Sequence, residues 1–236
     1  MEGFLPDAEG EALHALARTV GGEGVIVEIG SWKGRSTICL ARGSQLGAGV
    51  PVYAVDPHLG SAEHREWFGE VDTYDEFLAN IRRAGVEQLV VPLRLPSEKA
   101  ARTFDERIAL PFIDGAHDLE SVQRDADSWI PKLVAGGIVA FHDVSAAISW
   151  QAPRLVLRRL LRSGNYDVVR PIGSLVACRK REEPSRVAAS LSVIRLTIKD
   201  VRDLSSPRSW PKLGRRASRL VRWKARGLLG RALRRS

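Results

Sequence analysis

Five apolar segments of this chain each run into a turn that carries acids, histidines, serines or glycines. The carboxyl ends of parallel strands lie along one edge of a sheet, and ligands bind outside that edge. Any one of these turns could be an ordinary capped loop, but five in succession predict a ligand site. The residues concerned are Glu28, Gly30, Ser31, Gly34 and Ser36 in the first turn, Asp56 and His58 in the second, Ser97 and Glu98 in the third, Asp114 and His117 in the fourth, and His142 and Asp143 in the fifth.

The first of these turns, with the sequence EIGSWKGRS, limits the class of cofactor. Gly30 permits a tight turn, and Gly34 lies near the start of the following helix. A dinucleotide fingerprint needs glycine where this chain has Trp32, because the backbone must approach a pyrophosphate there. The turn therefore argues against NAD and FAD. It suits S-adenosylmethionine, whose amino-acid end can lie near Glu28 and Gly30, while Asp56 suits its ribose hydroxyls.

The pattern of the sequence also predicts the elements that bring these turns together. Short β-branched and apolar segments alternate with segments of helical pattern, which is typical of βαβ units and of a doubly wound, mostly parallel α/β sheet. Pro92 favours an edge position or a bulge in the third strand, and Ser97 is predicted to cap the next helix. The expected strands are 25–30, 50–57, 89–95, 108–115 and 136–144, with a closing hairpin at 166–172 and 174–180 around Gly173, and the expected helices are 8–19, 34–46, 73–84, 97–104, 119–133 and 153–162.

The composition is that of an ordinary globular protein. The chain has 236 residues, of which 44% are hydrophobic and 27% charged, and this excludes collagenous, low-complexity and wholly disordered proteins. No apolar run reaches the ~18 residues of a transmembrane helix, and the acidic start is unlike a secretory signal. Cys39 and Cys178 form no CxxC pair and no disulfide framework. We therefore expect a cytoplasmic protein with one domain and an extension.

The net charge of +8 is concentrated at the carboxyl end. Residues 205–236 contain eleven Lys or Arg and no Asp or Glu, which leaves 25 basic and 28 acidic residues, a net charge of −3, in residues 1–204. On a helical projection, residues 213–235 form a basic amphipathic helix of the kind that lies on anionic membranes. A disordered solubilising tail is the alternative. Nucleic acid is a less favoured partner, because no recognition module accompanies the charge.

These patterns divide the chain into a domain of residues 1–183, a helical connector of residues 184–204 and a basic tail of residues 205–236. The connector has apolar residues at helical spacing, which predicts that it packs on the domain or on another subunit of a homo-oligomer. These residues are Val187, Leu191, Ile194, Ile198 and Val201.

Several strings resemble the class I S-adenosylmethionine-dependent methyltransferases, and more narrowly the bacterial small-molecule and glycosyl O-methyltransferases, whose layout is that of catechol O-methyltransferases. The strings are VEIGSWKGRST, VYAVDPH, FIDGAHDLESVQRDADSWIPKLVAGGIVAFHD and the closing hairpin, over residues 22–180. The resemblance implies a Rossmann-like sheet of seven strands in the order 3-2-1-4-5-7-6, with the last strand antiparallel. It also implies S-adenosylmethionine as the cofactor, bound by Glu28, Gly30, Ser31, Gly34, Ser36, Asp56, Ser97 and Asp114.

The resemblance further implies the catalytic groups. In catechol-type relatives, acids and an amide after strands four and five hold a divalent cation that orients the acceptor and lowers the pKa of its hydroxyl. A base three residues past the first acid removes the proton. Asp114 matches the first acid, His142 and Asp143 match the strand-five pair, and His117 matches the base. Asp114, His117 and His142 are thus the implied catalytic residues, and Asp114, His142 and Asp143 the implied metal ligands.

His142 departs from the family pattern, which has a carboxylate at this position. Mg²⁺ prefers oxygen ligands, whereas imidazole suits softer divalent ions. Three alternatives therefore stay open: the metal is a softer ion, His142 is a second acid–base group, or there is no metal.

The acceptor is not determined by the sequence. Residues 58–74 form a long connection that contains His64, Trp67 and Phe68, and we predict that it covers the acceptor pocket, since long loops often act as lids. A surface loop is the alternative. Trp150 and Gln151 are predicted to line the same pocket. Aromatic side chains suit sugars and phenols alike.

The expected function is transfer of a methyl group from S-adenosylmethionine to a hydroxyl of a small molecule, glycoside or glycolipid. A glycolipid acceptor would fit a tail held at the inner face of a membrane. The alternative is a non-enzymatic protein that binds nucleic acid or membrane through its tail on a methyltransferase-like platform. An RNA methyltransferase is less favoured, because no base-methylating motif such as Asn-Pro-Pro-Tyr occurs.

Overall fold

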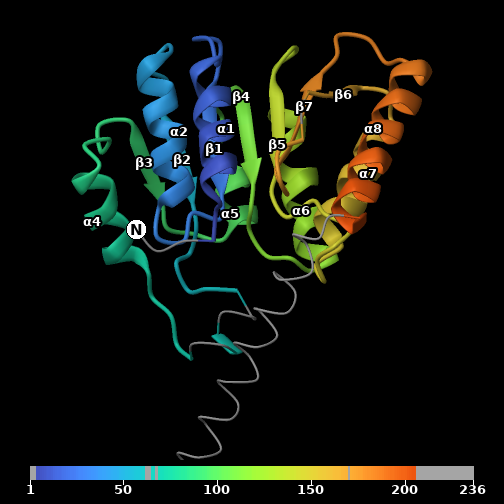
Figure 1. The fold of residues 1–236 in the computed structure, drawn as a ribbon. Helices are drawn as coiled ribbons and strands as arrows, with labels where there is room; N and C mark the ends of the chain where they lie inside the picture. Colours follow the sequence, from blue (N-terminus) through green and yellow to red (C-terminus); the bar gives the residue numbers. More distant parts are fainter. Residues whose placement is uncertain (1–3, 62–64, 67–68, 170, 206–236) are drawn as a thin grey trace, which may run out of the picture.

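The computed structural model describes residues 4–61, 65–66, 69–169 and 171–205. Their strands form one seven-stranded sheet in the order β3-β2-β1-β4-β5-β7-β6 (Figure 1). β7 is antiparallel to both of its neighbours, β5 and β6, and the other neighbouring strands are parallel. The predicted fold class, strand order and antiparallel strand are confirmed. The strands are β1 (Val25–Ile29), β2 (Val52–Val55), β3 (Val90–Leu93), β4 (Ile108–Ile113), β5 (Ile138–Phe141), β6 (Tyr166–Val168) and β7 (Val176–Lys180).

Helices cover both faces of the sheet. The first cluster of buried side chains joins one face to α1, α2 and α4, and the second joins the other face to α5, α6, α7 and α8. Central strands buried on both faces need continuous apolar runs, as in β4 and β5. The helices are α1 (Asp7–Arg18), α2 (Arg35–Leu46), α4 (Tyr74–Arg83), α5 (Ser97–Thr103), α6 (Leu119–Trp129), α7 (Ala152–Arg162) and α8 (Arg186–Ser205), and a 3₁₀ turn (Ile130–Lys132) follows α6.

Individual prolines and glycines in the sequence explain where the sheet and one of its helices end. β3 is the edge strand beside β2, and its Pro92 aligns with Ala54, which confirms the expected edge position. β6 and β7 form the predicted hairpin, where Ile172 and Leu175 bridge around Gly173. The helix expected at 119–133 ends earlier, at Trp129, because Pro131 has no N–H to continue the α-helical ladder.

Unusual backbone conformations are concentrated at the carboxyl edge of the parallel strands. Among the described residues, the non-glycine residues with positive φ are Trp32 (48°), His58 (61°) and Asp143 (54°). They follow β1, β2 and β5, respectively. Such conformations cost on the order of 1–3 kcal/mol and persist where the surroundings hold them, often at functional sites. The strain therefore lies at the edge that the sequence selects for the site.

Helix α8 packs on α7 and β6 through polar contacts (Figure 1). Asp200 binds Arg154 through two hydrogen bonds of 2.9 and 2.7 Å. The buried ammonium of Lys199 donates to the carbonyl of Val144 at 2.6 Å, and the Ser192 hydroxyl donates to the Tyr166 carbonyl. The inner face of α8 thus ties it to the loop that follows β5.

The apolar stripe predicted for α8 points away from the domain, whereas Ala188 and Leu196 of the same helix are buried against it. The residues of the stripe are 48–71% exposed, so the first predicted alternative, packing on the domain, was wrong, and packing on another subunit stays a prediction. The exposed residues are Val187, Leu191, Ile194, Ile198, Val201 and Leu204. Within the described part of the chain, no helix is both long and apolar enough to cross a membrane. The basic tail lies outside the described residues.

Candidate active site

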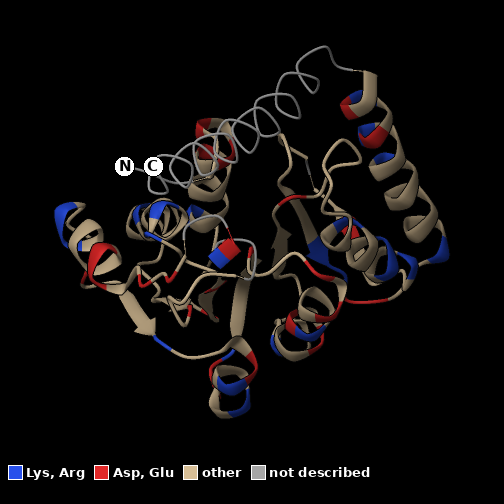
Figure 2. Cartoon of the chain, turned by 90° about the horizontal axis from the view of Figure 1, so that it is seen from below, with Lys and Arg blue, Asp and Glu red and all other residues tan. Residues whose placement is uncertain are grey.

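The predicted site residues meet at the carboxyl edge of the sheet. Figure 2 looks onto this edge, and acidic residues mark several of the turns there. The glycine-containing turn after β1 packs directly against the turn after β4. A side chain at Gly30 would put its Cβ 2.2 Å from the carbonyl oxygen of Asp114, and Gly30 has a φ of +90°. Glycine is therefore required here both by conformation and by close approach.

Glu28 is fully buried beneath this turn. Glu28 and Ile26 lie on the same face of β1, the face that meets α2. Glu28 accepts a hydrogen bond from the Thr37 hydroxyl. Burial raises the pKa of Glu28 to about 7, although the neighbouring hydroxyls of Ser36, Thr37 and Ser31 oppose the rise. Glu28 thus joins β1 to the start of α2, and a direct contact with a cofactor stays a prediction.

Glu28→Gln is expected to stabilise the protein above neutral pH. The folded carboxyl binds its proton more tightly than the unfolded one, so wild-type stability falls as pH rises from about 4.5 to about 7. The glutamine variant escapes this loss, which is at most about 3 kcal/mol. Urea unfolding of both proteins at pH 5 and pH 8 measures the difference. The exposed Glu23→Gln is the control, and an equal gap between Glu28→Gln and wild type at both pH values would contradict the prediction.

Asp56 clamps the turns after β1 and β2 together. Its Oδ2 accepts hydrogen bonds from the backbone N–H groups of Ser31 and Trp32, both at 2.8 Å, and its Oδ1 accepts from the N–H of His58 at 2.7 Å. A carboxylate has about four acceptor positions, so one remains for a ligand hydroxyl. Asp56 thus positions the two turns, and its contact with the ribose hydroxyls of a cofactor stays a prediction.

The prediction that Ser97 caps α5 was wrong, because Ser97 is the first residue of the helix and Pro96 holds the capping position. The Ser97 hydroxyl instead accepts a hydrogen bond from the Trp129 indole at 2.8 Å. Asp125, which the sequence analysis missed, is also hydrogen-bonded to Ser97, and burial raises its pKa to about 6. Asp125 shares the buried face of α6 with Val122 and Trp129. An acid on the apolar face of a predicted helix was the signal that could have identified it.

His117 and Asp143 form a pair at the ends of β4 and β5. The Nε2 of His117 lies 3.1 Å from the Oδ2 of Asp143. A carboxylate can only accept, so Nε2 carries a hydrogen, and in the neutral form of the ring the lone pair is on Nδ1. The imidazole also stacks on Trp150, with ring centroids 4.1 Å apart and planes within 8°. This arrangement can orient His117 as a base.

His142 lies deeper, with both ring nitrogens engaged by carboxylates. Its Nε2 is 2.7 Å from the Oε2 of Glu9, and its Nδ1 is 3.0 Å from the Oδ1 of Asp114 and 3.6 Å from the Oδ2 of Asp143. The implied ligand set of Asp114, His142 and Asp143 therefore does not offer a free nitrogen. Among the residues that the structure describes, the group whose potential ligand atoms lie within 4.8 Å of one another is Asp114, His117 and Asp143, and it therefore contains His117 instead of His142.

Glu9 is the other residue that the sequence analysis missed. It reaches the site from α1, 133 residues from His142, and is 3% exposed. Its Oε1 accepts hydrogen bonds from the Ser174 N–H at 2.5 Å and the Ser174 hydroxyl at 3.0 Å. Its place beside Leu13 and Ala17 on the buried face of α1 was the available signal.

Comparison with known families agrees with this fold. A family model described as a methyltransferase domain matches residues 27–144, half of the chain. A relative from Sinorhizobium fredii, the uncharacterized protein y4gI, is 31% identical over 123 residues. That match covers 50% of this chain but only 13% of the relative's length.

Three solved structures illustrate the likeness in fold. The O-methyltransferase NovP superimposes with a TM-score of 0.60 and 18% identity, over 74% of this chain and 80% of NovP. The O-methyltransferase from Bacillus cereus in complex with SAH superimposes with a TM-score of 0.56 and 21% identity, over 75% of this chain and 83% of that protein. Cofactor-bound Rv0187 from MTB superimposes with a TM-score of 0.57 and 20% identity, over 76% of this chain and 83% of Rv0187. At these identities the likeness establishes the fold, and together with the family model it shows that this chain belongs to the class I S-adenosylmethionine-dependent methyltransferases.

Proposed function

We propose that this methyltransferase transfers the methyl group of S-adenosylmethionine to a hydroxyl of a small molecule, glycoside or glycolipid, with His117 as the general base. The observation that carries the proposal is the His117–Asp143 pair stacked on Trp150 at the carboxyl edge. NovP and the Bacillus cereus protein, which share the fold, are described as O-methyltransferases.

The cofactor is proposed to lie over the turn after β1. Its amino-acid end would approach Gly30, its ribose hydroxyls the remaining acceptor position of Asp56, and the rest would extend toward Ser97. Ser31, Gly34, Ser36, Glu28 and Asp114 complete the proposed cofactor site through the turn and its supports. The hydrogen bonds from the Ser31 N–H to Asp56 and from the Thr37 hydroxyl to Glu28 support the shape of this turn.

The reaction is a displacement at the sulfonium methyl. The acceptor oxygen forms a bond to the methyl carbon, the carbon–sulfur bond breaks, and its electron pair stays on sulfur to give S-adenosylhomocysteine. The hydroxyl proton passes to Nδ1 of His117, and Asp143 stabilises the resulting imidazolium. Positioning in line supplies most of the acceleration, and the base adds typically 10²–10⁴-fold.

Calorimetric titration with S-adenosylmethionine and S-adenosylhomocysteine tests this function. We expect micromolar binding of both, weakened by Asp56→Ala and unchanged by Asp167→Ala, a control acid on β6 that pairs with Arg181. A folded protein that binds neither compound would overturn the proposal. Salt-dependent binding of nucleic acid by such a protein would favour the non-enzymatic alternative.

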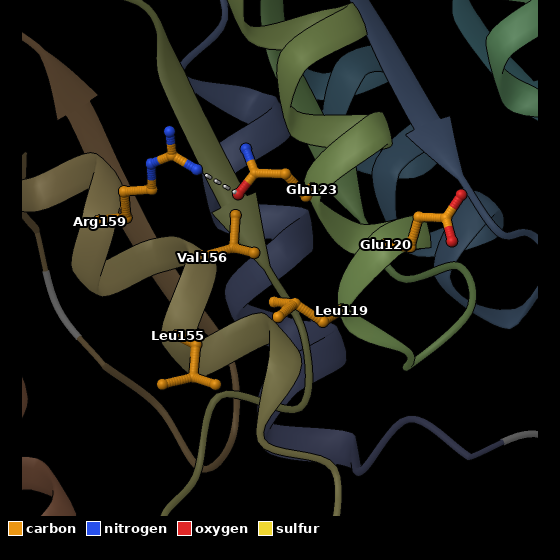
Figure 3. Close-up of a pocket in the computed structure, with 6 residues that line it drawn as sticks. All are labelled: Leu119, Glu120, Gln123, Leu155, Val156 and Arg159. Carbon is orange, nitrogen blue, oxygen red and sulfur yellow. Dashed lines mark hydrogen bonds between the residues drawn. The ribbon is translucent and has the colours of Figure 1, made fainter.

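An apolar groove beside the site suits the unreactive part of an acceptor. It lies between α6 and α7 and is lined by Leu119, Glu120, Gln123, Leu155, Val156 and Arg159, with Arg159 hydrogen-bonded to Gln123 at 3.3 Å (Figure 3). Leu119 follows His117 by two residues, and both leucines are about half exposed. We include this groove in the proposed acceptor site.

The predicted lid over residues 58–74 stays a proposal. Its ends are joined, because the Thr73 N–H donates to the His58 carbonyl at 3.1 Å and the buried His58 ring packs on Tyr74 and Phe77. His64, Trp67 and Phe68 lie outside the described residues.

We also propose that α8 docks on an anionic lipid surface. Its outward half carries the exposed apolar stripe and the exposed Arg202, while its acids, Asp200 and Asp203, bind Arg154 and Lys199. The sequence then continues into the basic residues 205–236. Apolar side chains bordered by arginine match the chemistry of an anionic membrane interface.

Sedimentation with vesicles tests this surface. The full chain is expected to bind phosphatidylserine vesicles, less so as salt rises, and phosphatidylcholine vesicles weakly. The double substitution Leu191→Ser and Ile198→Ser should lower binding severalfold, whereas Ser190→Ala and Thr197→Ala on the same helix should not. If the double substitution instead only abolishes a dimer seen by light scattering, the stripe binds a second copy and the lipid proposal fails.

A further inference from the structure

The loop after β5, residues 142–151, carries two parts of the proposed site. Asp143, near its start, pairs with His117, and Trp150, near its end, stacks on the same imidazole. Helix α8 hydrogen-bonds to this loop and lies beside α7 (Figure 1), although α8 is outside residues 27–144, the part of the chain that matches the methyltransferase family. The contribution of α8 to the site is therefore additional to the matched domain.

We propose that Lys199 of α8 is a positioning residue of the active site, which fixes the backbone beside Asp143 and thereby holds His117 in the orientation of a general base. The proposal rests on the proposed methyl transfer and adds to it a residue that acts without touching cofactor or acceptor. Lys199 is 6% exposed. Its ammonium donates to the carbonyl of Val144 at 2.6 Å and to the Oδ2 of Asp203 at 2.5 Å.

The backbone at Asp143 needs support from its surroundings. Its φ of 54° is a conformation that a residue with a side chain adopts at a cost and keeps only where neighbouring groups hold it. The Val144 N–H donates to the Ser174 carbonyl at 2.9 Å, and the Ser145 N–H donates to the Asp143 carbonyl at 3.1 Å. Since Lys199 binds the Val144 carbonyl, every polar group of the two peptide units from Asp143 to Ser145 is hydrogen-bonded.

The bond from Lys199 supports the peptide unit that follows Val144. Val144 is fully buried, so its carbonyl depends on a donor from the protein, and a buried carbonyl without a partner costs free energy comparable to a lost hydrogen bond. Lys199 reaches this carbonyl from 55 residues along the chain. Without the ammonium, the peptide unit could turn to find another donor, and the strained backbone at Asp143 would turn with it.

Asp203 completes the link between α8 and this part of the loop. Its Oδ2 accepts hydrogen bonds from the ammonium of Lys199 and, at 2.7 Å, from the hydroxyl of Ser145. The Ser145 hydroxyl also accepts a hydrogen bond from the N–H of Ala147 at 3.2 Å. The positive charge of Lys199 is thus both paired and hydrogen-bonded, as a buried cation must be, and the turn after Asp143 is held by the same pair.

The other end of the loop is held from α8 through α7. Asp200, the residue after Lys199, accepts two hydrogen bonds from Arg154 at 2.9 and 2.7 Å, and Arg154 donates to the side-chain oxygen of Gln151 at 3.5 Å. Gln151 follows Trp150 and donates to the Ser145 carbonyl at 3.3 Å. Helix α8 therefore supports the loop near both of the residues that contact His117.

The stacked imidazole gives a spectroscopic readout of this positioning. The His117 and Trp150 rings are nearly parallel, with centroids 4.1 Å apart, so the ring current of the indole shifts the His117 ring-proton NMR signals upfield. These signals are assigned by their absence in His117→Gln. In Lys199→Met we expect them to move toward the values of an unstacked histidine, because the loop no longer holds Asp143 and Trp150 in place.

Calorimetry with S-adenosylmethionine separates positioning from general support of the fold. Lys199 contacts the loop after β5 and not the turn after β1, so the affinity of Lys199→Met for S-adenosylmethionine should stay within about threefold of wild type. Unchanged His117 signals in a folded Lys199→Met protein would overturn the proposal. A parallel loss of S-adenosylmethionine affinity would also overturn it, because Lys199 would then support the whole site and not the base alone.

Two matched variants control for lost stability and lost charge. Lys180, on β7, donates to the Leu133 carbonyl at 2.6 Å, so Lys180→Met removes a bond of the same kind elsewhere in the domain. Arg202→Met removes an exposed positive charge from α8 itself. Both should keep the wild-type His117 signals. If either moved them as far as Lys199→Met does, a general effect would explain the result and the positioning role would be refuted.

Asp203→Asn keeps the proposal testable if Lys199→Met does not fold. The asparagine keeps the shape of the side chain but loses the charge that orients Lys199 and binds the Ser145 hydroxyl. We expect the His117 signals to move in the same direction as in Lys199→Met, by a smaller amount. His117 signals identical to those of wild type in Asp203→Asn would contradict the link through α8.

The positioning role and the methyl-transfer function fail in different ways. The His117 signals are read without cofactor or acceptor. A folded wild-type protein that binds neither S-adenosylmethionine nor S-adenosylhomocysteine would refute the function, and the role of Lys199 in it, whatever the His117 signals show. A protein that binds both compounds, but whose His117 signals do not respond to Lys199→Met, would refute the positioning role alone.

Discussion

Replacement of His117 by alanine is expected to lower kcat by 10²–10⁴-fold, the usual contribution of a positioned general base. Affinity for S-adenosylmethionine should stay within about threefold, because His117 contacts Asp143 and Trp150 and not the turn after β1. Single-turnover transfer of labelled methyl measures the first quantity, and calorimetry the second.

The control for this substitution is His14→Ala, a histidine on α1 that the proposed mechanism does not use. It should leave both quantities near wild type. An unchanged kcat in His117→Ala would assign the base to another group. A parallel loss of cofactor affinity would mean that His117 supports the fold of the site rather than proton transfer.

Gly30→Ala is expected to destabilise the protein by about 2–4 kcal/mol and to abolish cofactor binding. The new methyl group would overlap the Asp114 carbonyl, and the φ of +90° is unfavourable for any L-residue with a side chain. Relief requires the β1 turn to move away from β4, which strains the hydrogen bonds from Ser31 and Trp32 to Asp56.

Gly49→Ala separates the two causes. Gly49 also has a positive φ, +69°, but an added Cβ there would meet nothing within 4 Å. The Gly49→Ala variant should therefore lose only the stability that the unfavourable φ costs, and it should bind the cofactor as wild type does. Urea unfolding and calorimetry of both variants are compared. If Gly30→Ala were no more harmful than Gly49→Ala, the close approach of the β1 and β4 turns would not matter.

The fold was predictable because its signals are local. The buried strands are continuous apolar runs and the helices have their own periodicity, so the alternation could be recognised without knowledge of contacts. Pro92 marked the edge strand, and Gly173 marked the hairpin. A rule about the carboxyl ends of parallel strands then selected the correct edge for the site.

The direction in which α8 packs was not predictable from its apolar stripe. Such a stripe usually faces the core, but Ser192, Lys199 and Asp200 satisfy polar groups of the domain, and the stripe is left exposed. The choice depended on which partners α7, β6 and the loop after β5 offered. These partners are defined only once the sheet has formed.

The sequence by itself determined the fold class, the strand order through a family resemblance, and which residues stand at the carboxyl edge. Only the tertiary structure decided what those residues do to one another. Glu9 and His142 are 133 residues apart and meet because α1 packs beside the end of β5. Local patterns depend on residues a few positions apart, whereas the partners of His142, the hydrogen bonds to Asp56 and the partner of His117 depend on distances in space. Those distances exist only in the folded chain.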